Sequence, residues 1–123
     1  MSLPKAISAI RRHKKFLISG HVDPEADAIG SQLALASLVK RLGKDPIIID
    51  QDPPPISCDF MPGINSIVLC KNLNRKALKD VDCALVADCP TLERTGKVAG
   101  LITADMEIIN IDHHVSNDYF GHV

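Results

Sequence analysis

The chain has 123 residues, a length that fits one folded domain with its own hydrophobic core. Its 14 basic and 15 acidic residues leave a net charge of −1, which argues against a protein held to nucleic acid mainly by a basic surface, although a local basic patch is compatible with it. Aromatic residues make up 3 % of the chain, too few for a platform that stacks several bases. The 46 % of hydrophobic residues excludes general disorder.

Short apolar runs alternate with helical segments along the chain. We expect helices over 3–13, 27–42 and 74–79, and strands over 16–19, 46–49, 66–69, 83–87 and 108–111. In the longest helix, apolar residues recur at helical spacing from Ile29 to Leu42, and Gly43 is a typical stop. Strands that are apolar on both faces and separated by helices indicate an α/β fold with three layers: a mainly parallel sheet covered by helices on both faces.

Neither a membrane span nor a signal peptide is evident, because no apolar run is long enough to cross a bilayer and the N-terminus lacks an apolar core. The four cysteines form no Cys-x-x-Cys, which argues against a zinc ribbon or a thioredoxin-like site. We therefore expect a cytoplasmic protein without membrane attachment, with mostly reduced cysteines. A disulfide pair is nevertheless compatible with the sequence.

Polar side chains follow three of the expected strands, at the edge where a parallel sheet binds its ligands. They are His21, Glu25 and Asp27 after the first strand, Asp88 after the fourth, and Asp112, His113 and His114 after the fifth. Imidazoles mixed with carboxylates suit Mn²⁺ or Mg²⁺ better than Zn²⁺. The candidate ligands are His21, Glu25, Asp27, Asp88 and His113. Five ligands are too many for one ion and suit two ions about 3.5–4 Å apart with a bridging carboxylate, an arrangement that catalyses phosphoryl transfer.

Each of these residues also has an ordinary structural interpretation. Asp27 is placed to cap a helix, Asp88 to begin a turn before Pro90, and two adjacent histidines at a strand end are usually solvated. A plain α/β domain would, however, give no reason for such residues to follow three strands at one edge. Their joint placement favours a functional site.

The motifs resemble the first three of the DHH phosphoesterase superfamily. They are His21-x-x-x-Glu25-x-Asp27-x-x-Gly30-Ser31, then Asp88 with Arg94 and Gly96, then Asp112-His113-His114. Phe60-Met61-Pro62-Gly63 and the spacing from Asp112 to Asn117 resemble the branch of oligoribonucleases that also dephosphorylate 3′-phosphoadenosine 5′-phosphate. The resemblance covers essentially the whole chain.

The resemblance implies two Mn²⁺ ions, with Mg²⁺ as the alternative. His21 and Glu25 would hold one ion, Asp27 and His113 the other, and Asp88 would bridge them.

The resemblance also implies roles around the reacting phosphate. His114 would lie near the scissile phosphate, with Asp112 orienting a histidine. Arg94 and Asn117 are the candidate substrate-binding residues, although Arg94 also fits an ordinary surface position.

Two features depart from the family pattern. Glu25 stands where the family usually has aspartate, and the chain ends at Val123, before the family's fourth-motif aspartate and its substrate-gripping second domain. We therefore expect residues 1–123 to be an incomplete DHH N-terminal catalytic domain, either a truncated product or a natural remnant, with weak or no activity alone.

The sequence thus predicts a metal-dependent phosphoesterase that hydrolyses phosphodiester or phosphomonoester bonds of short oligonucleotides or nucleotides through two metals. Within the enzyme class, an inorganic pyrophosphatase and a cyclic-dinucleotide phosphodiesterase are the alternatives. Outside it, the alternatives are a non-catalytic metal- or nucleotide-binding module and a plain α/β domain. An exposed sheet edge near the C-terminus would also allow a homodimer.

Overall fold

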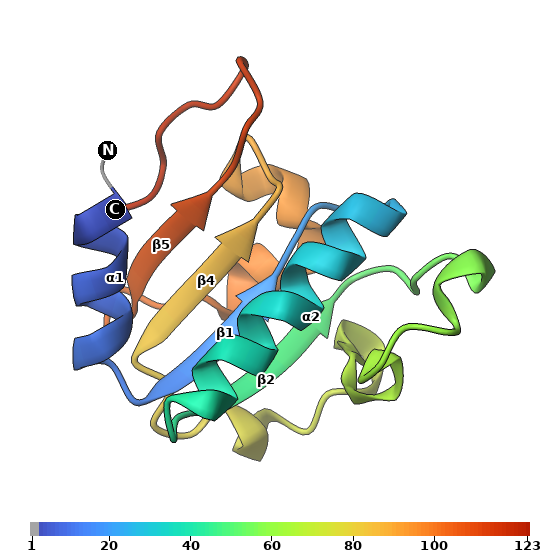
Figure 1. Cartoon of the computed structure of the whole chain (residues 1–123), viewed down its shortest axis with the longest axis horizontal. Coiled ribbons are helices and arrows are strands. Elements are labelled where there is room, and N and C mark those ends of the chain that lie inside the picture. Colours follow the sequence, from blue (N-terminus) through green and yellow to red (C-terminus); the bar gives the residue numbers. More distant parts are fainter. Residues whose placement is uncertain (1–2) are drawn as a thin grey trace.

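The computed structural model describes residues 3–123 and contains a five-stranded, fully parallel sheet (Figure 1). Its strands are β1 (Lys15–Ser19), β2 (Asp45–Asp50), β3 (Val68–Leu69), β4 (Cys83–Ala87) and β5 (Glu107–Ile111), in the spatial order β3-β2-β1-β4-β5. Every neighbouring pair is parallel. The predicted α/β fold with a parallel sheet is confirmed.

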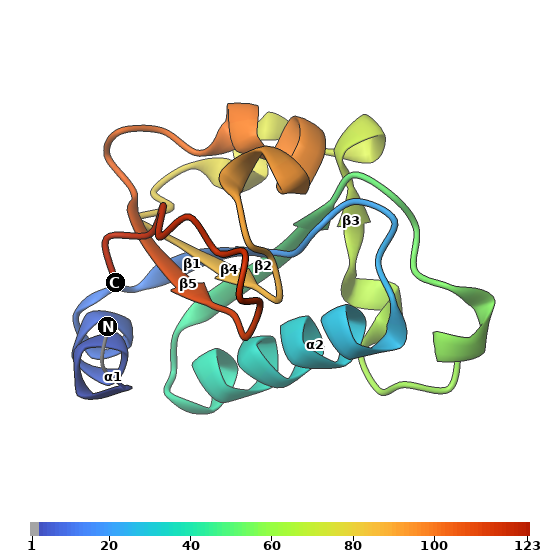
Figure 2. The ribbon, with the colours of Figure 1, turned by 90° about the horizontal axis from the view of Figure 1, so that it is seen from above.

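The two faces of the sheet are covered differently, as Figure 2 shows from above. Helices α1 (Leu3–Arg12) and α2 (Ala26–Arg41) lie on one face. The 3₁₀ segments η4 (Arg75–Leu78) and η5 (Leu92–Leu101) lie on the other. Shorter 3₁₀ turns precede and follow β3: η1 (Ile56–Cys58), η2 (Ile64–Ser66) and η3 (Cys70–Asn72).

The 3₁₀ turns are the main departure from the predicted elements. The segment 74–79 forms one short 3₁₀ turn, and the strand expected over 66–69 is reduced to Val68–Leu69. The segment η5 was not predicted from the sequence. Gly96 interrupts it with a positive φ of 65°. Because the segment is not one continuous helix, its apolar residues do not recur at the spacing by which a helix is predicted.

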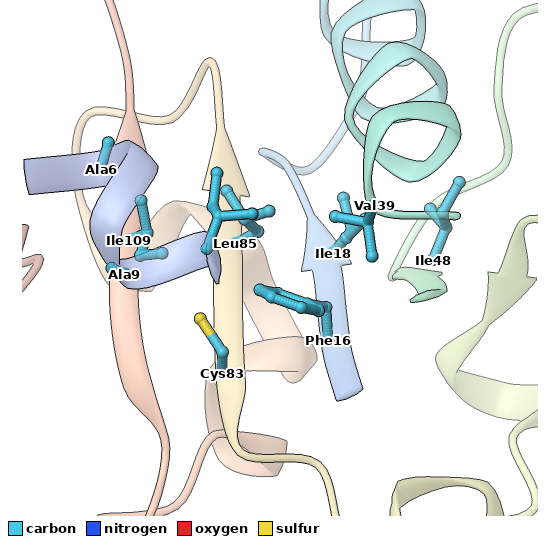
Figure 3. Close-up of a cluster of buried hydrophobic side chains, with 10 residues drawn as sticks. Ala6, Ala9, Phe16, Ile18, Val39, Ile48, Cys83, Leu85 and Ile109 are labelled. Atoms are coloured by element: carbon cyan, nitrogen blue, oxygen red, sulfur yellow. The ribbon is translucent and has the colours of Figure 1, made fainter. Parts of the chain in front are cut away.

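The hydrophobic core has one part on each face of the sheet, because successive strand residues point to opposite faces. On β1, Phe16 and Ile18 pack beneath the two α-helices, in the cluster drawn in Figure 3. Leu17, between them, packs with Val98 and Leu101 of η5 on the opposite face. The three β1 residues are fully buried, so the strand and the loop that follows it are firmly anchored.

The edge at β5 is paired with the C-terminal segment. The backbone of Asn110 donates to the Val123 carbonyl at 3.0 Å, and His122 donates to the Ile108 carbonyl at 2.8 Å. In addition, the Ile108 N–H donates to the His122 ring at 2.8 Å. We expected this sheet edge to be exposed and available for a dimer. Its backbone groups at Ile108 and Asn110 instead form hydrogen bonds within the chain.

All four cysteines are free thiols. Burial raises the pKa of Cys83 to about 12 and that of Cys89 to about 11, which keeps both protonated and unreactive near neutral pH. Within residues 3–123, no helix is both long enough and apolar enough to cross a lipid bilayer.

The strand order reverses between β1 and β4. From β1 the chain moves outward through β2 to β3, then returns to the other side of β1 for β4 and β5. Figure 1 shows β2 on one side of β1 and β4 and β5 on the other. Connections that leave neighbouring strands in opposite directions open a crevice at the carboxyl edge, where open α/β sheets bind ligands. His21 follows β1 and Asp88 follows β4, so both begin at this reversal.

Candidate metal centre

Asp88 occupies the centre of the crevice. It follows β4 directly, and its backbone N–H donates to the Ile111 carbonyl of β5 at 2.9 Å. Its φ of 51° lies in the left-handed region, which aspartate tolerates better than most residues. The turn leaves the side chain only 9 % exposed. The Asp88 carboxylate is therefore a fixed, nearly buried acid at the floor of the site.

Three imidazoles face this carboxylate. His113 Nε2 lies 2.8 Å from Asp88 Oδ1, and His114 Nδ1 lies 3.8 Å from the same oxygen. His21 Nε2 lies 3.8 Å from the other oxygen, Oδ2. The carboxylate thus presents one oxygen to His113 and His114, which follow β5, and the other to His21, which follows β1. This is a favourable arrangement for a carboxylate that bridges two ions.

His21 is oriented by its own loop. Its Nδ1 lies 2.6 Å from the Val22 carbonyl, which accepts a hydrogen bond from a protonated Nδ1. The proton at Nδ1 leaves a lone pair on Nε2, the atom that faces Asp88. A backbone carbonyl that fixes the tautomer in this way is typical of metal-binding histidines.

Glu25 and Asp27 reach the site from the N-terminal end of α2. Asp27 Oδ2 lies 3.6 Å from His113 Nε2, and the Asp27 side chain is 68 % exposed. Glu25 is the N-cap residue of α2, but its side chain makes no capping hydrogen bond. Capping therefore does not explain Glu25, and Asp27 lies within the first turn rather than at the cap position. The two carboxylates line a cavity of about 540 Å³ that also contains His21, Asp88, Arg94, His113 and His114.

Asp112 holds the ring of His114. Its Oδ1 lies 2.5 Å from His114 Nδ1, and its Oδ2 accepts from the Asn117 amide at 2.8 Å. Burial raises the pKa of Asp112, but the hydrogen bonds from Asn117 and His114 outweigh burial and leave that pKa below its ordinary value. The hydrogen bond to Asp112 raises the pKa of His114. His114 is thus an oriented imidazole that retains its proton to a higher pH than usual.

Asn117 serves this internal network. Besides Asp112, its amide nitrogen contacts Asn110 Oδ1 at 2.7 Å. It lines a neighbouring cavity of about 590 Å³, shared with Asp112 and both adjacent histidines, and does not line the cavity that contains Glu25 and Asp27. Its polar atoms therefore position Asp112 in this structure.

Arg94 is brought to the site by η5. Its backbone carbonyl accepts from the Val22 N–H at 2.7 Å, which ties η5 to the loop that carries His21. Among the described residues that line the 540 Å³ cavity, it is the only lysine or arginine. Its guanidinium is suited to an anionic ligand held against the carboxylate-rich floor.

Asp50, at the end of β2, is a buried residue to which the sequence assigned no role. It is 1 % exposed, and its Oδ1 accepts from Ser19 Oγ at 3.2 Å and from the Gly20 N–H at 3.3 Å. With the Gln32 amide nitrogen turned toward the carboxylate, Gln32 also donates at 2.8 and 2.9 Å. Burial raises the pKa of Asp50 to about 6 in spite of these donors. Asp50 thus joins β1, just before His21, to α2, which carries Asp27.

Gln51 and Asp52, which follow Asp50, form hydrogen bonds to two neighbouring loops. Asp52 accepts from the Asp23 N–H at 2.7 Å, and Gln51 Oε1 accepts from the Lys97 N–H at 2.9 Å. A Cβ on Gly96 would lie 2.2 Å from Gln51 Oε1 and 2.6 Å from Val22 Cγ1, so a larger residue would displace Gln51 from this bond. The sequence offers one signal for these supporting contacts, namely Asp50 directly after the apolar residues Ile47–Ile49. The residues that Asp50 contacts come from distant segments of the chain.

The residues present fit a divalent metal centre. Asp88, His113 and His114 each offer a ligand atom, and these atoms lie within 4.8 Å of one another. His21 directs Nε2 to the same place, and the carboxylates of Glu25 and Asp27 face the same cavity. All the predicted metal-ligating residues are therefore brought together, as are His114, Asp112 and Arg94.

Comparison with known proteins identifies the family of this chain. The model of the DHH family, N-terminal domain, matches residues 15–122. The chain is 33 % identical over 111 residues to the bifunctional oligoribonuclease and PAP phosphatase NrnA of Thermus thermophilus, a match that covers 86 % of this chain and 30 % of that protein. An exopolyphosphatase-related protein from Bacteroides fragilis superposes with a TM-score of 0.86 at 27 % identity, over 98 % of this chain and 36 % of that one. The chain thus spans about a third of the length of both proteins, and it belongs to the DHH phosphoesterase superfamily.

Proposed function

We propose that this chain carries the metal-binding half of a phosphoesterase that hydrolyses phosphodiester or phosphomonoester bonds in short oligonucleotides or nucleotides. The observation that carries the proposal is the Asp88 carboxylate, whose two oxygens face histidines on opposite sides of the crevice. The Thermus thermophilus relative, an oligoribonuclease and PAP phosphatase, supports this substrate class.

In this proposal the site holds two divalent ions, Mn²⁺ in preference to Mg²⁺. His21 and Glu25 hold one ion, Asp27 and His113 hold the other, and Asp88 bridges them. Mixed imidazole and carboxylate donors support this choice of metal. Such a pair, when bound, lowers the pKa of water and neutralises charge on the phosphoryl oxygens.

The remaining side chains would act on the phosphate. Protonated His114 donates a hydrogen bond to a phosphate oxygen, and Asp112 keeps its ring in place with Nδ1 engaged. Arg94 binds a second oxygen of the same group. Asn117, proposed from the sequence as a substrate-binding residue, contributes by fixing Asp112.

We also propose that the chain corresponds to the N-terminal catalytic domain of its longer relatives. The site is open on the side of His113 and Asp27, whose side chains are 73 % and 68 % exposed. A second lobe on that side would close the cavity over the substrate and contribute further contacts.

The test has two parts. Calorimetry with Mn²⁺ measures metal binding, and hydrolysis is followed for a five-nucleotide RNA, 3′-phosphoadenosine 5′-phosphate, pyrophosphate and a cyclic dinucleotide. We expect Mn²⁺ to bind and the first two substrates to be hydrolysed, slowly by this chain and faster by a protein that contains the second lobe. Failure of both proteins to hydrolyse any substrate with Mn²⁺ would contradict the proposal.

Matched variants separate the site from general charge effects. Asp27→Asn removes an exposed carboxylate at the cavity, and Asp45→Asn removes an exposed carboxylate at the opposite end of the sheet, where β2 begins. We expect only Asp27→Asn to weaken Mn²⁺ binding, by about ten-fold or more. Equal effects of the two substitutions would argue against a metal centre at this cavity.

A non-catalytic metal-binding module is the second candidate, favoured by Glu25. This side chain is one methylene longer than the usual aspartate and has no hydrogen-bond partner within the described chain. Tight Mn²⁺ binding without hydrolysis by either protein would support this candidate.

A further inference from the structure

A second, strongly basic pocket lies outside the metal cavity. It has a volume of about 260 Å³ and is lined by Lys71 of η3, Arg75 of η4 and Lys97 of η5. Cys70, Leu73 and Leu101 complete its wall, and no carboxylate is among the described residues that line it. It is formed where the 3₁₀ segments of the sheet face opposite α2 meet one another, and Figure 2 shows η4 and η5 on that face.

In the part of the chain that the structure describes, the three cations of this pocket are unpaired, unlike several other basic side chains. Arg12 pairs with Glu107 at 2.6 Å, and Lys15 donates to the Lys79 carbonyl at 2.7 Å. Within residues 3–123, the side chains of Lys71, Arg75 and Lys97 make no ion pair or hydrogen bond. In a chain whose net charge is −1, these unpaired positive charges form a concentrated local patch.

Such a pocket favours an anion with several oxygens. Three positive charges around one concavity repel one another unless an anion lies between them. The apolar wall formed by Leu73 and Leu101 lowers the local dielectric constant and strengthens the attraction. A guanidinium with two ammonium groups matches the charge and hydrogen-bonding geometry of a phosphate.

The segment η5 connects this pocket to the metal cavity. Arg94 lines the metal cavity and Lys97, three residues later, lines the basic pocket. Both positions are held by backbone hydrogen bonds, from Val22 to the Arg94 carbonyl at 2.7 Å and from Lys97 to Gln51 at 2.9 Å. A bound chain with repeated phosphates can therefore contact cations of one fixed element at both places.

We propose that the basic pocket binds a phosphate group of the oligonucleotide substrate away from the scissile bond. The identity of the ligand rests on the proposed function, whereas the affinity of the pocket for phosphate groups does not. The pocket gives this domain a contact with the nucleotide chain that is separate from the metal ions.

Binding of a fluorescein-labelled five-nucleotide RNA, followed by anisotropy in EDTA, tests the pocket without turnover. The pocket variant is Lys71→Gln/Arg75→Gln, in which both substituted residues are exposed. The control variant, Lys40→Gln/Arg41→Gln, removes two exposed cations from the C-terminal end of α2 and has the same net charge. We expect the pocket variant to bind the RNA about ten-fold more weakly at 0.1 M salt, and the control within about two-fold of wild type.

The salt dependence gives a second readout. Each lost phosphate contact lowers the slope of log affinity against log salt by about 0.7, so the pocket variant has the shallower slope. Equal weakening by both variants, no weakening by the pocket variant, or no RNA binding by the wild type would overturn the proposal. Pocket-dependent binding without Mn²⁺-dependent hydrolysis would support the pocket and contradict the proposed enzyme.

Discussion

Asp50 offers a direct test of how this fold supports its site. The carboxylate is 1 % exposed, and all its donors are neutral groups: the Ser19 hydroxyl, the Gly20 N–H and the Gln32 amide. Its hydrogen bonds thus come from neutral dipoles, and the nearby His21 adds a favourable Coulombic interaction. Asp50→Asn keeps an acceptor for Ser19 and Gly20, and the Gln32 amide can rotate to accept from the new side-chain nitrogen.

The magnitude follows from the pKa of Asp50, which burial raises from 3.8 to about 6. The folded protein binds more protons at Asp50 than the unfolded chain between these values, so the stability contributed by this residue falls as pH rises through them. The full difference is about 3 kcal/mol, of which about half develops between about pH 5 and about pH 7.5. Because Asp50→Asn lacks this titration, the variant gains stability relative to wild type over that window.

Urea unfolding at a series of pH values, in EDTA, measures this difference. Asp82→Asn is the matched control. Burial raises the pKa of Asp82, but hydrogen bonds from the Lys15 N–H and the His13 ring outweigh burial and lower it. Above about pH 5, Asp82 is ionised in both the folded and the unfolded state. The Asp82 variant and its parent are compared in a His13→Gln background, which removes the ring 3.1 Å from the Asp82 carboxylate, and we expect the Asp82 variant to run parallel to its parent there. If the free energy of unfolding of Asp50→Asn also ran parallel to that of wild type with pH, the result would refute the argument that burial raises the pKa of Asp50.

Two further predictions concern the loops of the site. Gly96→Ala places a Cβ 2.2 Å from Gln51 Oε1 at a residue with φ 65°, and we expect urea unfolding to show a loss of at least about 2 kcal/mol. Unchanged stability would show that the contact relaxes freely. Asp112→Asn removes the charged partner of His114, so NMR titration should show a lower pKa for His114, with the opposite shift contradicting the assigned hydrogen bond.

The sheet and the gathering of polar residues at its carboxyl edge were predictable because both rest on local patterns. Apolar runs such as Cys83–Ala87 identify buried parallel strands, and the polar residue after each run is placed by the topology at one edge. The hydrogen-bond network around Asp50 was not predictable, because its partners Ser19 and Gln32 are distant in sequence. The 3₁₀ segment η5 was missed for a similar reason: its register depends on packing against Leu17 and on the turn at Gly96.

The candidate metal centre has a buried floor and an exposed rim, and this contrast explains how Glu25 fits where the resemblance leads us to expect aspartate. Asp88 is 9 % exposed and held by the β4–β5 pairing, so a longer side chain there would displace the ligand oxygens. Glu25 is exposed at the start of α2, without a capping bond, so its extra methylene can be absorbed by a change of rotamer. We therefore expect Glu25→Asp to change Mn²⁺ affinity by less than about ten-fold, and Asp88→Glu to lower it by more than about 100-fold. Calorimetry compares the two, and similar losses would show that the rim is as rigid as the floor.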